Sequence, residues 1–266
     1  MGTKRIGLAR MEALLENLKR EINLSGSTVC AQLGACQGTF GAPPLVIDDD
    51  STVAAGTDEA VMIHQYSDGL RLHVQNVGTQ TILIPAATTT GMNYAYDATN
   101  NEGVQWVASL NTHKGYPGVD RFTVGTHGAF YAELEFSIED VSGTDDCAFG
   151  FRKVEAEQAA IDNYDEMAAL NVISGDINIE TILNNAGTTT TDTTANLANS
   201  GVVTLRVDVS SAGVVTYKVD GSAPAATAAF TFDDGEVVTP FFYYINASDV
   251  AGAVILRKVT WGLKEK

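Results

Sequence analysis

Apolar and polar residues alternate with a period of two through much of the C-terminal half of the chain. From Ala132 to Ile138 every second residue is apolar, and Val203 to Val209 follows the same rule. Such alternation places the apolar side chains on one face of a β-strand. Turn-forming residues separate short runs of this kind, which predicts an antiparallel sandwich and not a parallel sheet. Further runs lie at 70–75, 81–84, 104–110, 146–154, 215–221 and 252–263.

The first 25 residues show a helical period instead. Their apolar residues recur at spacings of three and four, as the a and d positions of a short coiled coil do. Two heptads are marginal in isolation, so this helix needs a partner. It either associates with copies of itself about a symmetry axis or packs on the body of this protein or on another protein. The predicted contact residues of the arm are Leu8, Met11, Leu15, Leu18 and Ile22 with the basic Lys4, Arg5 and Arg10.

Between the arm and the strands, residues 26–60 are rich in Gly, Ser, Thr and Ala and contain Pro43-Pro44. Three successive aspartates at 48–50 cannot all converge on one calcium ion, so they indicate a solvated turn. We therefore predict three parts, which are a helical arm at 1–25, an extended connector at 26–60 and a sandwich domain at 61–266.

The charge of the chain narrows the range of partners. The formal charge is −17, with 33 acidic against 16 basic residues. General nucleic-acid binding is therefore not expected, because phosphate neutralisation needs Lys and Arg. No apolar run approaches the ~18 residues of a membrane span, and no secretory segment is expected at the N-terminus.

Three cysteines, Cys30, Cys36 and Cys147, do not form a disulfide framework. Cys30 and Cys36 are close enough in sequence to pair, but three reduced thiols in a reducing cytoplasm are the favoured interpretation. The four histidines, at 64, 73, 113 and 127, lack metal-ligand spacing, so no metal or other cofactor is predicted.

The order of the strand sequences resembles the concanavalin A-like lectin/glucanase superfamily. The matching segments are Phe-Tyr-x-Glu-x-x-Phe at 130–136, Gly-Phe-Arg at 150–152, Leu-Arg-Val-Asp-Val at 205–209, Tyr-Lys-Val-Asp-Gly at 217–221 and a last strand at 252–263. The resemblance covers about 145 residues. It implies an all-β fold, an antiparallel jelly-roll β-sandwich, here with a short N-terminal α-helical arm.

Glucanases of this superfamily carry a Glu-x-Asp-x-Glu strand, with one Glu as nucleophile and the other as acid/base. The equivalent residues here are Asp176, Asn178 and Glu180. Asp176 is one methylene shorter and Asn178 cannot ionise, so we predict a polar outer strand face, no catalytic residues and no enzyme. Glu133, Glu135 and Glu139 are predicted to face solvent.

Sugar binding remains open at this point. Lectin sandwiches use exposed aromatic residues, and the candidates here are Tyr94, Tyr96, Trp106, Tyr116 and Trp261, although most such residues pack in cores or at rims. The Thr- and Asn-rich stretch at 184–199 is predicted to be a polar loop, either a contact arm or mobile.

Residues 3–21 resemble the start of virion structural proteins from tailed phages of marine bacteria. This resemblance implies a capsid decoration (cement) protein, a homotrimer that contacts the major capsid protein or another virion protein. Its location would be the virion, after assembly in the host cytoplasm. One alternative is a phage fibre or receptor-binding protein that recognises host glycans. The other is a glycoside hydrolase.

Overall fold

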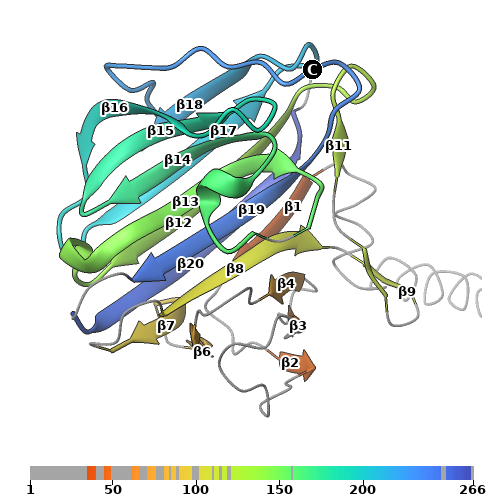
Figure 1. Cartoon of the computed structure of the whole chain (residues 1–266). Coiled ribbons are helices and arrows are strands. Elements are labelled where there is room, and N and C mark those ends of the chain that lie inside the picture. The colour runs from red at the N-terminus through yellow and green to blue at the C-terminus, as the bar shows by residue number, and fades with distance from the viewer. Residues whose placement is uncertain are drawn as a thin grey trace, which may run out of the picture.

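The computed structural model describes residues 35–39, 45–48, 61–65, 71–75, 81–83, 85–87, 90–97, 102–109, 111–113, 116–118, 121–156, 158–246 and 250–264. These residues form two antiparallel sheets that face each other, so the predicted all-β sandwich is confirmed (Figure 1). Helix within them is limited to two 3-10 turns, η1 (Val141–Gly143) and η2 (Ile161–Asn163). The predicted helical arm, with all eight of its contact residues, lies outside the described residues.

The smaller sheet, here called sheet A, has the strand order β18-β17-β12-β20-β7-β6, and β1 pairs with the free part of β20. Several neighbouring strands of this sheet are distant in sequence, because β12 pairs with both β17 and β20. A bulge between Glu135 and Phe136 admits one extra residue of β20. The strands are β1 (Ala35–Thr39), β6 (Pro85–Ala87), β7 (Met92–Tyr96), β12 (Phe130–Ile138), β17 (Val202–Val209), β18 (Val215–Val219) and β20 (Gly252–Leu263).

The larger sheet, sheet B, has the order β16-β15-β14-β13-β19-β8-β4-β3-β2, with β11 beside β19 and β5 beside β8. A separate small hairpin joins β9 (Asn111–His113) to β10 (Tyr116–Gly118). The strands of sheet B are β2 (Leu45–Asp48), β3 (Val61–Gln65), β4 (Arg71–Gln75), β5 (Thr81–Ile82), β8 (Glu102–Ser109), β11 (Phe122–Thr123), β13 (Thr144–Lys153), β14 (Met167–Ile173), β15 (Asp176–Ile182), β16 (Thr189–Asn196) and β19 (Val237–Asn246).

The main core fills the space between the two sheets. Alternate residues of each strand point into it, as the period-two pattern predicts, and large aromatic side chains occupy much of it. Trp106 stacks on Phe242 with the ring centroids 5.3 Å apart, and Phe122 stacks on Phe130 at 4.5 Å. Tyr94, Tyr96 and Trp261 are also buried there, so four of the five aromatic residues considered for sugar stacking are core residues instead.

A second, smaller core lies on the outer face of sheet B. The segment 154–166, which links β13 to β14, folds back over that face, and its η2 turn stands in front of the sheet (Figure 1). Ile161 and Tyr164 of this segment pack on Met167, Ile182 and Phe241 of the strands. Sheet B is therefore covered on its inner face by the main core and on part of its outer face by this segment.

Strands occur in two segments, 184–199 and 26–60, that were predicted to be a loop and a connector. The stretch 184–199 is not a loop throughout, because β16 pairs with β15 along its length. Threonine is β-branched and therefore favours a strand. The loop was predicted from the polarity of these residues alone, and this strand preference was not taken into account. Within 26–60, β1 and β2 are paired to β20 and β3. The division of the chain at 25 and 60 remains a prediction.

Candidate functional site

Beside the apolar rows on which segment 154–166 packs, the outer face of sheet B carries polar residues from four adjacent strands. Strand register places Asn171 of β14 opposite Asn178 of β15, and Asn178 opposite Asp192 of β16. In the next row Glu180 of β15 lies opposite Thr190. We call Asp146, Asn171, Asn178, Glu180, Thr190 and Asp192 the acid–amide cluster.

Asn171 joins two carboxylates within this cluster. Its amide nitrogen donates to Asp146 Oδ1 at 2.6 Å and to Glu180 Oε2 at 2.9 Å. Its amide oxygen accepts from the Cys147 backbone N–H at 2.8 Å, which fixes which end of the amide faces the acids. Asp146 Oδ1 and Glu180 Oε2 therefore accept from the same nitrogen atom, and the distance between them is at most the sum of these two hydrogen-bond lengths. The two side chains come from β13 and β15, with β14 between them.

Both carboxyl groups have pKa values raised above their ordinary range. Burial, followed by the charge of Glu180, raises the pKa of Asp146 to about 7, although the Asn171 hydrogen bond opposes the shift. Burial also raises the pKa of Glu180, against hydrogen bonds from Asn171 and Thr190 that favour its anion. Asp145 and Asp162 add like charge to both groups. Burial is thus the main reason that the pKa of each acid lies above its ordinary value.

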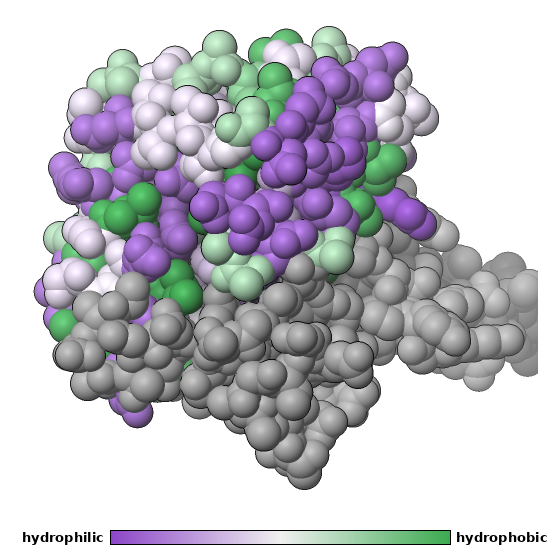
Figure 2. Space-filling view, in the orientation of Figure 1, coloured by the Kyte–Doolittle hydropathy of each residue, from purple (hydrophilic) through white to green (hydrophobic). Residues whose placement is uncertain are grey.

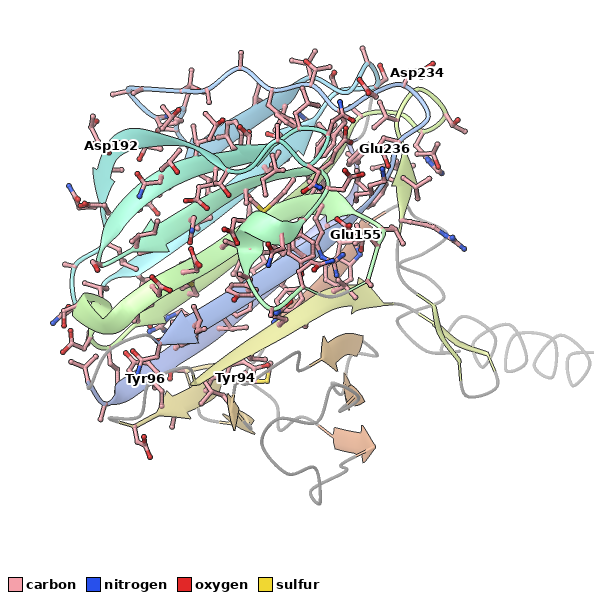
Figure 3. All side chains as sticks on the ribbon, in the orientation of Figure 1. Tyr94, Tyr96, Glu155, Asp192, Asp234 and Glu236 are labelled. Carbon is pink, nitrogen blue, oxygen red and sulfur yellow. The ribbon has the colours of Figure 1, made fainter. Side chains whose placement is uncertain are left out.

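The covering segment closes the neighbouring part of the face. Tyr164 Oη donates to Gln105 Oε1 at 2.9 Å, and Gln105 Nε2 donates to the Gln158 carbonyl at 2.8 Å. The Arg152 guanidinium lies 4.6 Å from the centroid of the Tyr164 ring. Figure 3 shows Asp192 on β16 at one side of the face and Glu155 on the covering segment at the other. Hydrophilic surface gathers in front of β13 and β14 in the space-filling view (Figure 2).

Sequence reasoning located only part of this cluster. Asn178 and Glu180 share the outer strand face, as predicted, but they are 8% and 4% exposed and not solvated. Asp176 is exposed at the start of β15. Asp146 and Asn171 were missed because the alternation shows which face each residue takes but not which strands become neighbours.

The other predicted positions lie elsewhere. Glu133 is on the outer face of sheet A, where it accepts from Arg206 Nη1 at 3.1 Å. Glu139 is exposed and Glu135 half-buried. Cys147 is a free, buried thiol. Within the described ranges, no group of three His, Cys, Asp or Glu side chains is placed to hold a metal ion, and no helix there is long and apolar enough to cross a membrane.

Comparison with known proteins finds similarity in structure alone. No family model matches the chain, and no curated protein sequence matches it either. Among solved structures, a protein of Mycobacterium tuberculosis described as an immunostimulatory antigen and pseudo β-1,3-glucanase superposes with a TM-score of 0.52, at 10% identity over 86% of this chain and 98% of that one. The β-glucanase of Bacillus licheniformis gives 0.46, at 11% identity over 87% and 99%. The carbohydrate recognition domain of Emp47p gives 0.49, at 13% identity over 76% and 91%.

These comparisons correct one prediction. The prediction that the chain is not an enzyme, made from the altered Glu-x-Asp-x-Glu strand, is corrected: the structure that superposes with a TM-score of 0.52 belongs to a protein described as a pseudo β-1,3-glucanase, and a fold of this kind does not by itself decide against catalysis. This similarity tests neither the predicted contact role of the arm residues nor the predicted phage origin. The strand order and the superposition together establish the fold, which is an antiparallel jelly-roll β-sandwich.

Proposed function

We propose that this protein binds a saccharide on the outer face of sheet B, at the acid–amide cluster. The observation that carries the proposal is the pair of carboxylates held by the single Asn171 amide. Asn171 is itself fully buried and locked by the Cys147 N–H, so the pair is positioned before any ligand arrives. Preorganised polar groups at the edge of an apolar core are what small-molecule sites use for orientation.

The chemistry of the cluster suits sugar hydroxyl groups. An ionised carboxylate only accepts hydrogen bonds, an amide both donates and accepts, and a hydroxyl can satisfy either. Asp192 and Thr190 are exposed beside the more buried Glu180, so the polar surface continues outward along β15 and β16. Four of the named aromatic residues, Tyr94, Tyr96, Trp106 and Trp261, are buried in the main core, so recognition in this proposal depends on hydrogen bonds and not on stacking against them.

Glycan arrays followed by calorimetry on the full chain test this proposal. We expect Glu180→Gln and Asp146→Asn, which preserve shape, to weaken binding of the best saccharide at least ~10-fold, since a charged acceptor is worth roughly 1.5–3 kcal/mol. Glu139→Gln, an exposed carboxylate outside the cluster, is the matched control. An array without hits, or variants that bind like the parent, would refute the proposal.

Hydrolysis of the bound saccharide is a second candidate, favoured by the spacing and pKa of the same pair. Retaining glycosidases hold two carboxyl groups ~5 to 5.5 Å apart, and the two hydrogen bonds of Asn171 keep the facing oxygens of Asp146 and Glu180 within that limit. Asp146, with a pKa raised to about 7, suits the general acid. Glu180 receives two hydrogen bonds that favour its anion and suits the nucleophile.

Release of reducing ends from a bound polysaccharide tests the second candidate. Glu180→Gln is expected to lower the rate ~10²- to 10⁴-fold, and Asp146→Asn is expected to remove the alkaline limb of the pH profile. Binding without any cleavage by the parent protein would leave the binding proposal intact and exclude hydrolysis.

We also propose that the sandwich is carried on a virion, as a capsid decoration protein of a tailed phage. It is supported by the resemblance of residues 3–21, and the receptor-binding alternative would use the same saccharide site. Capsid-binding assays with and without residues 1–25 test it. Equal binding by both forms, or no binding by either, would remove the predicted contact role of the arm.

A further inference from the structure

The outer face of sheet B is acidic around the acid–amide cluster. Asp146, Glu180 and Asp192 belong to the cluster itself. The exposed Asp145 and Asp162 add like charge to Asp146 and Glu180. The charges that act most strongly on these two buried carboxyl groups are therefore other carboxylates. Gathering like charges in a partly buried place is unfavourable unless an opposite charge joins them.

No Lys or Arg side chain in the described part of residues 121–264 supplies that opposite charge. Arg152 is on β13 like Asp146, but it is about 20 Å farther along the strand and is 2% exposed. Lys153 beside it is paired with Asp165 at 2.6 Å, and Arg121 lies at the same end of sheet B. The remaining basic residues of this range belong to strands of sheet A or follow them, and they are Arg206, Lys218, Arg257, Lys258 and Lys264.

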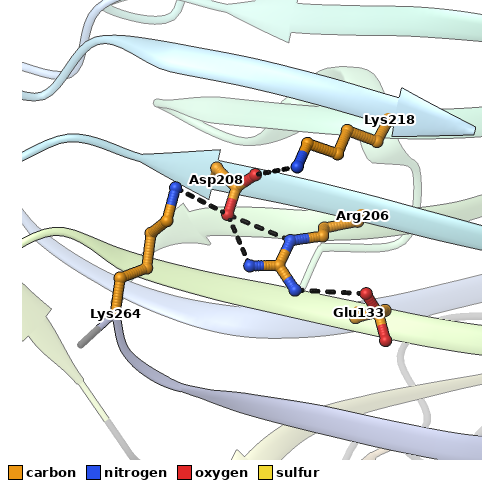
Figure 4. A network of polar contacts seen from close by, with 5 residues as sticks. All are labelled: Glu133, Arg206, Asp208, Lys218 and Lys264. Atoms are coloured by element: carbon orange, nitrogen blue, oxygen red, sulfur yellow. Dashed lines mark hydrogen bonds and ion pairs between the residues drawn. The ribbon is translucent and has the colours of Figure 1, made fainter. Parts of the chain in front are cut away.

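A buried carboxylate on the outer face of sheet A has a different environment. The Asp208 side chain is 4% exposed, and its Oδ1 lies 2.9 Å from Arg206 Nη2 and 3.3 Å from Lys264 Nζ (Figure 4). Its Oδ2 lies 3.8 Å from Lys218 Nζ. These three cations offset the cost of burying that anion. The buried acids of the acid–amide cluster have no comparable cation among the described residues, so their charge is left for a ligand to balance.

Hydrogen bonds inside the cluster use most of its donors and leave acceptors open. The Asn171 amide nitrogen donates to both Asp146 and Glu180, so both of its hydrogens are engaged. The Thr190 hydroxyl donates to Glu180 Oε1 at 3.3 Å. Asp146 and Asp192 each accept through Oδ1, and no donor among the described residues reaches Oδ2 of either. A ligand that fits this cluster therefore donates more hydrogen bonds than it accepts.

We propose that the saccharide bound at the acid–amide cluster is an amino sugar, whose free ammonium group lies beside the carboxylates of Asp146 and Glu180. An ammonium group is a cation with three donors and no acceptor, so it matches both the charge of the cluster and its open acceptors. A uronic acid or a sulfated sugar would bring another anion to a place without Lys or Arg. This inference rests on the proposed saccharide binding and narrows it to one class of sugar.

Calorimetry on the full chain with three matched oligosaccharides tests the inference. The probes are the β-1,4-linked hexamers of glucosamine, N-acetylglucosamine and glucose at about pH 6.5, which differ only in the group at carbon 2. We expect the glucosamine hexamer to bind at least ~10-fold more tightly than the other two, because only it offers a charged donor to the carboxylates. This preference should shrink as salt rises from 0.1 M to 0.5 M, since salt screens charges.

Three variants locate the ammonium group. Asp146→Asn should reduce the preference for the glucosamine hexamer over the glucose hexamer at least ~5-fold. Asp145→Asn removes an exposed neighbouring charge without touching the core and should reduce it about 2-fold. Glu139→Gln, exposed and outside the cluster, should keep it in full.

The outcomes separate this inference from the proposed function. Equal or tighter binding of the glucose or N-acetylglucosamine hexamer, or of an anionic saccharide, would overturn the inference and leave saccharide binding intact. A preference for glucosamine that persists in both aspartate variants would place the ammonium elsewhere and would also overturn it. A glycan array without any hit would remove the proposed function and the inference together.

Discussion

The outer faces of the two sheets are built from the same alternating pattern but have different fates. On sheet B, the segment 154–166 returns over the strands, so outward residues such as Ile182 are fully buried and a polar cluster is left partly enclosed beside them. On sheet A, outward residues such as Ile255 are only half-buried, and ion pairs dominate. A residue that points outward from a sheet is therefore not always exposed to solvent. Its exposure depends on whether another segment of the chain covers that face.

The largest effect is expected where sheet B permits no side chain at all. A Cβ at Gly150 would lie 2.3 Å from the Ala168 carbonyl oxygen and 2.7 Å from the Ala169 Cα. Since backbone atoms cannot yield cheaply, Gly150→Ala should lower the free energy of unfolding by about 3 kcal/mol or prevent folding. Gly128, whose Cβ would meet nothing within 4 Å, is the control. Urea denaturation of both variants gives the comparison, and equal stabilities would contradict it.

Two isoleucines measure the two faces directly. Ile182→Ala on sheet B removes a fully buried side chain from the second core, so a loss of about 3 kcal/mol is expected. Ile255→Ala on sheet A removes a half-buried one and should cost about 1 kcal/mol or less. Chemical denaturation again supplies the values. If the two losses were alike, the covering segment would not be part of the stable core.

Stability should also depend on pH through the buried acids near sheet B. Glu166 is 1% exposed, and neither of its carboxylate oxygens has a hydrogen-bond partner among the described residues. Burial, followed by the charges of Glu236 and Asp233, raises its pKa to about 7, and the pKa of Asp146 is raised similarly. Above about pH 4.5, the folded chain therefore keeps protons on these two carboxyl groups that the unfolded chain has already released.

The sign of the effect follows from that difference. Stability from these groups is fully present at low pH and is lost as the pH rises from about 4 through 7, by up to about 3 kcal/mol for each group. Unfolding measured at pH 5 and pH 8 should show the decrease, and Glu166→Gln combined with Asp146→Asn should remove most of it. A stability that rose over this interval in the parent would contradict the assignment.

The smallest effects belong to the charged face of sheet A. Asp208→Asn removes the buried anion that three cations share, and about 1.5 kcal/mol of stability should be lost. Glu133→Gln removes a more exposed partner of Arg206 and should cost no more than about 0.5 kcal/mol. Thermal unfolding of the two variants tests the ranking. A reversed order would show that Glu133, and not Asp208, anchors the basic residues.

The fold was largely predictable because burial leaves a local trace in the sequence. The alternation in β12 and β17 predicted strands with one buried face, and both strands have it. β17 and β18 are joined by a turn at Ser211-Ala212-Gly213. Gly213 at the turn has a φ of 81°, and a Cβ there would lie 2.2 Å from the Phe232 carbonyl oxygen, which explains the glycine. The Thr-rich edge strand β16 was not foreseen, since its polar composition concealed a strand preference.

The site was harder to predict, because its residues are separated in sequence and brought together only by strand pairing. Glu180 was visible as part of a polar strand face, but its partners Asp146 and Asn171 come from β13 and β14. A sequence alone determines which residues of each strand share a face, since a side chain alternates with every step of the backbone. Only the tertiary structure decides which strands are neighbours and which faces are covered. Those choices place two carboxylates on one amide and raise the pKa of both.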